Sequence, residues 1–173
     1  MANSNNPKSF VVQNPHLYEA PVVYPVAASE TFQKGDVVFF DANGRITLTA
    51  GSIAGICASG ITGTTSKKPE TTSSATAGDS EVLVYTDPRI IFYGQLSSFA
   101  LTDPYTTRSS ATCFDVVTTT GAQYINAASS ANDHVKVLSR SSEAGNGVLS
   151  EIGAYAKCLF QFNPLVHFRG CTA

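Results

Sequence analysis

The segment Gly35–Ile61 most constrains the fold, because it joins three short strand-like runs through two turns. Val37–Phe40 is a run of β-branched and aromatic residues, which favour extended structure. Asp41–Gly44 follows and ends in Asn-Gly, a pair that tolerates the positive φ angles of a tight hairpin. Ile46–Thr49 then alternates apolar and polar residues, as a half-buried strand does. The sequence therefore predicts an antiparallel meander.

A third strand of this meander is predicted over Ile53–Ile61, after a turn at Gly51-Ser52. Gly55 and Gly60 lie within or beside it. A glycine in a strand marks a sharp bend or a close approach of two backbones. Short and strongly bent strands of this kind begin a small β-barrel or a sandwich.

The rest of the chain continues this pattern, and no segment shows a sustained helical period, although Thr106–Ala111 allows one helical turn. Further strands are predicted at Val82–Tyr85, Ile90–Tyr93, Phe114–Val117, Gln123–Asn126, Val135–Leu138 and Ile152–Phe162. In the last of these, Cys158, Phe160 and Phe162 alternate onto one apolar face. We therefore expect an all-β protein, a small β-barrel, β-tulip or sandwich.

The segments around the strands define the expected domain organisation. We predict an extended N-terminal arm over residues 1–21, a β-barrel domain over 22–163 with a long surface loop at 63–79, and a C-terminal tail over 164–173. The loop is rich in Ser and Thr, has no periodicity, and is long for a compact domain.

The arm carries four large apolar side chains, Phe10, Val12, Leu17 and Tyr18. Free termini are usually small and polar, so we expect the arm to lie on a partner with these four residues as anchors. The alternative is a frayed terminus. On either hypothesis the strands begin near Val22, so removal of Met1–Glu19 is expected to leave the body folded.

The charge of the chain is low, with charged residues at 14% against about a quarter in typical proteins. A surface rich in Ser and Thr is poorly protected against association. Such a surface fits an extracellular β-protein, or a protein whose surface other chains cover, and composition leaves both open. The net charge of −2 and the single basic pair Lys67-Lys68 do not predict binding to nucleic acid.

Met1–Phe10 has no apolar core of the kind that signal peptides carry. The chain has no run of about 18 apolar residues, which a membrane-spanning helix needs, so we expect synthesis in a cytoplasm and no membrane partner. Cys57, Cys113, Cys158 and Cys171 are far apart and include no C-x-x-C pair. We expect four free thiols rather than a zinc site or disulfides.

Motifs of the common enzyme classes are absent: there is no G-x-S-x-G elbow, no phosphate-binding loop and no G-x-G-x-x-G. His16, His134 and His167 are isolated in sequence. The segment Asp41–Gly44 resembles the opening of a calcium loop, but Ile46 stands where that loop needs glycine. We therefore predict no catalytic, cofactor or metal site, and no enzymatic activity.

The acidic residues Asp36, Asp87, Asp103 and Asp115 all neighbour expected turns or strand ends. A carboxylate at such a position usually accepts hydrogen bonds from nearby backbone N–H groups. We therefore assign these residues to capping rather than to chemistry.

Six short motifs, in order along the chain, carry a resemblance to a known class of proteins. They are Lys34–Val38, Ala54–Gly60, Val82–Tyr85 with Phe92, Cys113–Val116, Val135–Leu138 and Tyr155–Phe162. In the order of these motifs the chain resembles the capsid decoration, or cement, proteins of tailed bacteriophages, and the likeness spans roughly Val22 to Phe168. The resemblance implies a β-barrel or β-tulip body with a terminal arm. It also implies a place outside the capsid shell, often as a trimer, and a role in reinforcing contacts between major capsid proteins without catalysis.

The expected function is therefore that of a structural virion protein, made in the host cytoplasm and located on the capsid exterior. Its expected partners are the major capsid protein and further copies of itself, as a homotrimer or as neighbours. An alternative is a β-sandwich carbohydrate-binding or adhesin module of a virion or cell surface. Such modules use aromatic platforms, whereas this chain has no Trp and its seven Tyr are scattered. A third hypothesis, a hydrolase on a β-scaffold, is opposed by the missing motifs.

Overall fold

The computed structural model describes residues 10–13, 15–17, 19–49, 51–59, 70–97, 113–119, 122–126, 128, 131–140 and 154–164. The strands are β1 (Val11–Val12), β2 (Val22–Pro25), β3 (Thr31–Gln33), β4 (Val37–Phe40), β5 (Ile46–Thr47), β6 (Ser52–Cys57), β7 (Glu70–Thr72), β8 (Glu81–Tyr85), β9 (Ile91–Gln95), β10 (Asp115–Thr119), β11 (Ala122–Asn126), β12 (Val135–Arg140) and β13 (Lys157–Phe162). Among the described residues the one helical element is a 3₁₀ turn, η1 (Pro15–Leu17). The predicted all-β class is confirmed.

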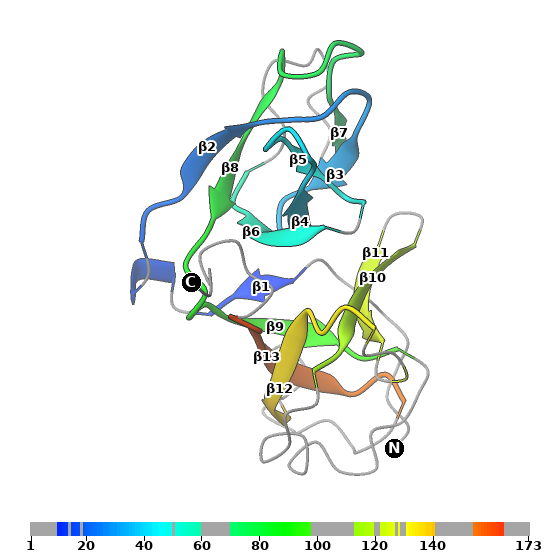
Figure 1. The fold of residues 1–173 in the computed structure, drawn as a ribbon. Coiled ribbons are helices and arrows are strands. Elements are labelled where there is room, and N and C mark those ends of the chain that lie inside the picture. Colours follow the sequence, from blue (N-terminus) through cyan, green and yellow to red (C-terminus); the bar gives the residue numbers. More distant parts are fainter. Residues whose placement is uncertain are drawn as a thin grey trace.

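Two antiparallel sheets form most of the body (Figure 1). The five-stranded sheet has the order β2-β8-β6-β4-β5, and the four-stranded sheet has the order β1-β9-β13-β12. Two small sheets, β3-β7 and β10-β11, complete the fold. In Figure 1 the five-stranded sheet and β3-β7 make up the upper part, and the other two sheets make up the lower part.

Isolated β-bridges connect strands that lie apart in the sheet order, in both parts of the fold. Val26, which follows β2, pairs in parallel with Ile46 of β5, so the two outer strands of the five-stranded sheet meet. In the lower part, bridges from Phe114 to β12 and from Leu96 to β11 place the β10-β11 hairpin between β12 and the end of β9. These are single bridges rather than ladders, so the described residues contain no closed barrel. The body is two curled sheets.

The meander over β4, β5 and β6 forms as its sequence predicts, and β4 has the expected bounds. Asp41 Oδ1 accepts the backbone N–H groups of Asn43 at 2.8 Å and Arg45 at 2.9 Å. Gly44 adopts a φ of 74°, a conformation that suits glycine. The side chain of Asp41 and the glycine together fix this turn.

Gly55 lies where β6 comes closest to β8. Its φ is 151°, and a Cβ at this position would stand 1.9 Å from the carbonyl oxygen of Tyr85. The pairing of β4 with β6 shifts register between Val38 and Phe39, next to this point. The expected bend and close approach at Gly55 are confirmed, while Gly60 lies outside the described residues.

The five-stranded sheet is buried on both faces. Its smaller core, on one face, consists of Val26, Val38, Ile46, Ala54, Cys57, Val82 and Val84. On the other face, Phe39 and Ile56 join a larger core that also contains Phe92 and Phe160 of the four-stranded sheet. Because this main core draws on both sheets, they pack as one body.

A buried amide also joins the two parts. Gln123 of β11 accepts the backbone N–H of Val37 at 2.6 Å through Oε1, and its Nε2 donates to the carbonyl oxygen of Val37 at 2.9 Å. The same nitrogen donates to Thr118 Oγ1 at 3.0 Å. The side chain therefore satisfies both backbone groups of Val37 as a neighbouring strand would.

The last strand is shorter than its alternation predicts. Strand β13 begins at Lys157 rather than Ile152, because Ala154 and Tyr155 form a turn in which Tyr155 has a φ of 61°. Ile152 itself lies outside the described residues. The expected inward face is confirmed, since Cys158, Phe160 and Phe162 are all buried.

Part of the predicted surface loop 63–79 is instead a strand. Strand β7 pairs antiparallel with β3, and Ser73, which follows it, is buried. Its hydroxyl accepts the N–H of Glu30 at 2.9 Å and donates to the carbonyl of Ala27 at 2.6 Å. Hydrogen bonds rather than an alternating apolar pattern fix this segment, which explains why the sequence did not reveal it. Residues 60–69 and the helical turn allowed at Thr106–Ala111 lie outside the described residues.

Replacing Phe160 tests the main core. Its ring is fully buried and lies 5.8 Å from that of Phe92, centroid to centroid. Phe160→Ala should lower the free energy of unfolding by about 3–5 kcal/mol, because it removes apolar contacts and leaves a cavity. Leu159→Ala, on the half-buried opposite face, is the matched control and should cost clearly less. Chemical denaturation measures both, and equal losses would contradict the observed facing of β13.

Candidate interaction surface

The four predicted anchors of the arm have different environments in the structure. Phe10 is 2% exposed and belongs to the main core, and Val12 is half-buried against that core. Leu17 is 66% exposed. Tyr18 lies outside the described residues. The structure thus brings Phe10 and Val12 together inside the chain and leaves Leu17 at the surface.

Residues 10–13 form part of the four-stranded sheet rather than a separate arm. Strand β1 pairs antiparallel with β9. The N–H of Gln13 donates to the carbonyl of Ile91 at 2.8 Å, and the N–H of Phe10 donates to the carbonyl of Gly35 at 3.0 Å. The second bond reaches the turn before β4, so this segment contacts both sheets.

The ring of Phe10 occupies a space that a glycine leaves open. A Cβ on Gly94 of β9 would stand 2.3 Å from Cδ1 of Phe10. The Phe10 ring also meets Phe92 edge-on, with centroids 5.3 Å apart. Removal of Met1–Glu19 would therefore remove a core side chain, which corrects the expectation that the body does not depend on this segment. The run Phe10–Val12 was the available signal, since these residue types favour strands.

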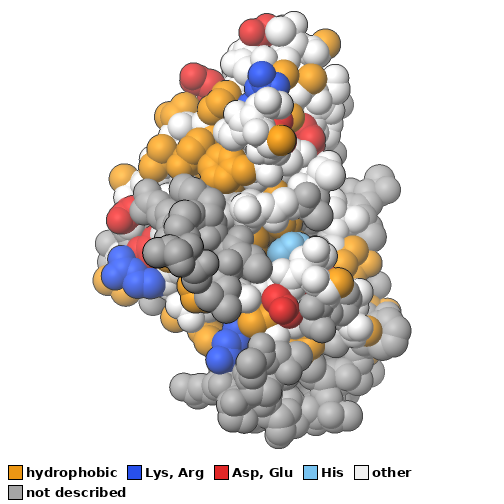
Figure 2. All heavy atoms as spheres, viewed as in Figure 1, with side chains coloured by type: hydrophobic (Ala, Val, Ile, Leu, Met, Phe, Trp, Pro, Cys, Tyr) orange, Lys and Arg blue, Asp and Glu red, His pale blue; other side chains and the backbone are white. Residues whose placement is uncertain are grey.

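Exposed large apolar side chains occur along the segment from β1 to β2. Val11 is 52% exposed, Leu17 66%, Val22 37% and Val23 52%. We call these four residues the apolar edge surface. Figure 2 shows apolar side chains over the β2 side of the upper part.

The strands that carry this surface stand at the ends of their sheets. β1 is the terminal strand of the four-stranded sheet, and β2 is that of the five-stranded sheet. A terminal strand with exposed apolar residues is a template for association, and proteins usually blunt it with charge or proline. Pro25 ends β2, but Val22 and Val23 before it are both exposed. This arrangement suits burial against another chain.

The capping role predicted for the acidic residues is confirmed at three positions. Asp36 Oδ2 accepts the N–H of Gln33 at 2.9 Å, and Asp115 Oδ1 accepts that of Asn132 at 2.9 Å. Asp87 accepts the N–H of Arg89 at 2.8 Å, and the Arg89 guanidinium binds both of its oxygens at 3.0 and 2.7 Å. Asp103 lies outside the described residues.

His134 serves as a buried hydrogen-bond acceptor. Its Nδ1 accepts the backbone N–H of Val116 at 3.1 Å, and its ring centroid lies 5.0 Å from that of Phe39. Burial lowers the pKa of the imidazole, although the charges of Asp115 and Asp133 act in the opposite direction. A neutral ring is what this hydrogen bond needs. His167 and the side chain of His16 lie outside the described residues.

Cys57, Cys113 and Cys158 are buried and are not part of a disulfide. Burial raises the pKa of Cys113 and places that of Cys57 well above its ordinary value, with the charge of Asp36 as a further cause for Cys57. Cys171 lies outside the described residues.

Within the described part of the chain, no three His, Cys, Asp or Glu side chains group to hold a metal ion, and no helix is long and apolar enough to cross a membrane.

Comparisons of the chain with known protein families, with curated proteins and with solved structures found no match. The fold and the apolar edge surface are therefore the structural grounds on which a function can be proposed.

A double-mutant cycle tests the fit of Phe10 over Gly94. Gly94→Ala should push the ring out of place and cost on the order of 1–3 kcal/mol of unfolding free energy. In a Phe10→Ala background the same change should cost less, because the ring that it displaces is gone. A coupling of about 0.5–3 kcal/mol between contacting residues is expected from denaturation of the four proteins. Strictly additive losses would contradict this contact.

The buried imidazole predicts a pH dependence of stability. His134 titrates near pH 6.5 when unfolded and at a lower pH when folded. The stability that it contributes is therefore complete above about pH 6.5 and is lost as the pH falls through the folded pKa, with a limiting slope of about 1.4 kcal/mol per pH unit. His134→Asn keeps an acceptor for the N–H of Val116 but cannot titrate. The stability of this variant should therefore fall less than that of the native protein between pH 7 and 5, the range around the pKa of an unfolded histidine. Identical pH profiles would refute the assignment.

Proposed function

We propose that this protein is a structural virion protein, which decorates the outside of a phage capsid and reinforces contacts between major capsid proteins. The observation that carries the proposal is the apolar edge surface, four exposed apolar side chains on two terminal strands and the 3₁₀ turn between them. Such a surface can bury itself against a second chain and can also add backbone pairing at a sheet edge. A surface of this kind stabilises a complex through burial and backbone pairing, without a chemical reaction.

The energetics of this surface favour association. Burial of one Val or Leu side chain contributes about 1.5–3 kcal/mol, so several acting together offset much of the cost of joining two bodies. The low share of charged residues, 14%, also fits an interface core, from which charge is depleted. We propose the capsid as the partner because the order of the sequence motifs resembles that of capsid decoration proteins. The exposed valines and leucine support an interface on the segment from β1 to β2.

Charged substitutions on this surface test the proposal. Leu17→Asp with Val23→Asp should lower the free energy of unfolding of the isolated protein by only about 1 kcal/mol, because both side chains are exposed and Asp is less favourable than Val in a strand. The same double variant should occupy capsid shells at least roughly tenfold less well, since even one lost apolar contact of about 1.5 kcal/mol has that effect. Ala75→Asp with Thr76→Asp, at two exposed positions of a bend, is the control, because it adds the same charge.

The measurement adds each protein to undecorated shells and determines the copy number per particle by quantitative mass spectrometry. The heat resistance of the particles is the second measurement, because a reinforcing protein should raise it. Equal occupancy by the variant at Leu17 and Val23 and by the control would exclude the apolar edge surface as the attachment site. Absence of the native protein from purified virions would refute the function itself.

A further inference from the structure

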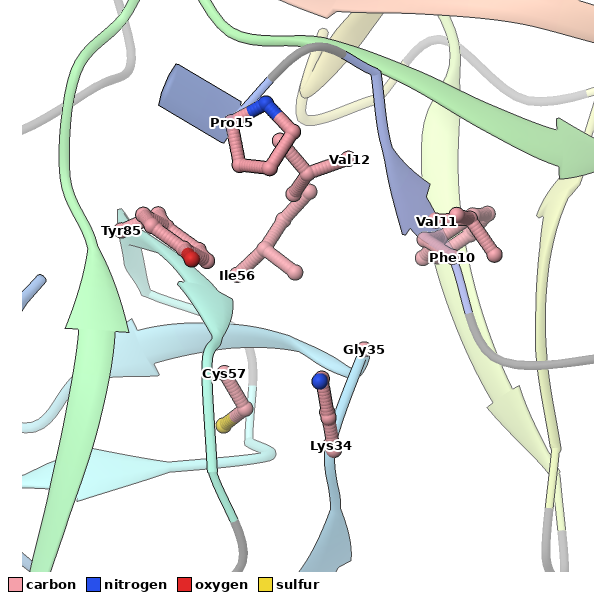
Figure 3. A pocket seen from close by; sticks show the side chains of 9 residues that line it. All are labelled: Phe10, Val11, Val12, Pro15, Lys34, Gly35, Ile56, Cys57 and Tyr85. Atoms are coloured by element: carbon pink, nitrogen blue, oxygen red, sulfur yellow. The ribbon is translucent and has the colours of Figure 1, made fainter. Parts of the chain in front are cut away.

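A cavity of about 310 Å³ lies between β1 and the ends of β6 and β8 in the five-stranded sheet. Figure 3 shows Val12 and Pro15 on one side of it, and Ile56 and Tyr85 on another. Its size falls within the range of about 300–1,000 Å³ that is usual for small-molecule sites. The walls come from segments that are distant in sequence, so the folded chain creates this space.

The lining is mostly apolar, and its polar side-chain groups are the Lys34 ammonium, the Tyr85 hydroxyl and the Cys57 thiol. Lys34 lines the cavity, and none of the other described lining residues is acidic. Asp36 is not among the lining residues, although its charge acts on Cys57, and its carboxylate accepts the N–H of Gln33. Lys34 forms no ion pair with another described residue. Its ammonium is therefore available to an anion at a mostly apolar site.

We propose that this cavity binds a small amphipathic carboxylate, a straight-chain fatty acid of about eight to ten carbons. Its hydrocarbon chain would lie among Val12, Ile56 and Tyr85, and its carboxylate would meet the Lys34 ammonium. A cavity with apolar walls hydrates poorly and forgoes dispersion contacts, so an apolar chain gains by filling it. The carboxylate supplies a negative charge, which none of the described lining residues carries. This activity is separate from attachment to a capsid.

Isothermal titration calorimetry of the full chain with octanoate, decanoate and octylammonium tests the proposal. Octanoate should bind at least roughly tenfold more tightly than octylammonium, because the two have chains of similar length and head groups of opposite charge. Decanoate should bind more tightly than octanoate, by roughly fourfold for each added methylene. Absence of measurable binding of decanoate, or equal binding of the two head groups, would overturn the proposal.

Two variants locate the site. Lys34→Met should weaken octanoate binding at least roughly tenfold and leave the binding of octanol unchanged, while Lys136→Met on β12 is the matched control and should have no effect. Val12→Phe should fill the space and weaken all of these ligands, with its fold checked by chemical denaturation. Unchanged octanoate binding in Lys34→Met, or in a folded Val12→Phe protein, would show that the ligand binds elsewhere and would overturn the assignment. All measurements use the protein without capsid shells, so their outcome is independent of the function proposed above.

Discussion

Burial of aromatic side chains between the two curled sheets holds the molecule together. Phe92 lies at the centre of this packing, with ring centroids 5.3 Å from Phe10, 5.8 Å from Phe160 and 5.0 Å from Phe162. Neither sheet closes by a continuous ladder among the described residues, and the shared core packs against both of them. The amide of Gln123 adds direction to this non-directional packing, because it pairs with Val37 at one register only.

The sequence predicted those strands and turns that neighbouring residues determine. The β4 strand and the turn after it follow from β-branched residues and from Asn-Gly, and the structure has both. The start of β13 did not follow, because alternation continues through Ala154 and Tyr155 although the backbone turns there. Strand β7 also escaped prediction, since its partner β3 lies about forty residues away along the chain and it carries no apolar pattern.

The candidate surface was predictable only in part, for a similar reason. Sequence identified the N-terminal segment as apolar, but a strand that adds to a partner and a strand that adds to its own sheet have the same residue pattern. The difference depends on Gly94, whose missing side chain makes room for Phe10. No local rule connects two residues so far apart. Leu17 was identified, whereas Val22 and Val23 were not, because proline beside a valine run indicates an edge strand but does not show which of its side chains stay exposed.

The burial of Phe10 changes the energetics that an interface on this segment would have. A free arm loses about 1–2 kcal/mol of backbone entropy for each residue that it orders on binding, which nearly cancels the gain from each apolar contact. Here β1 is already paired with β9, and β2 with β8, so both ends of the segment from Val11 to Val23 are fixed before any partner arrives. Folding has therefore met much of the ordering cost, and more of the burial energy of Val11, Val22 and Val23 remains available for association. A surface of few side chains can bind under these conditions, because its strands are held in place by the core behind them.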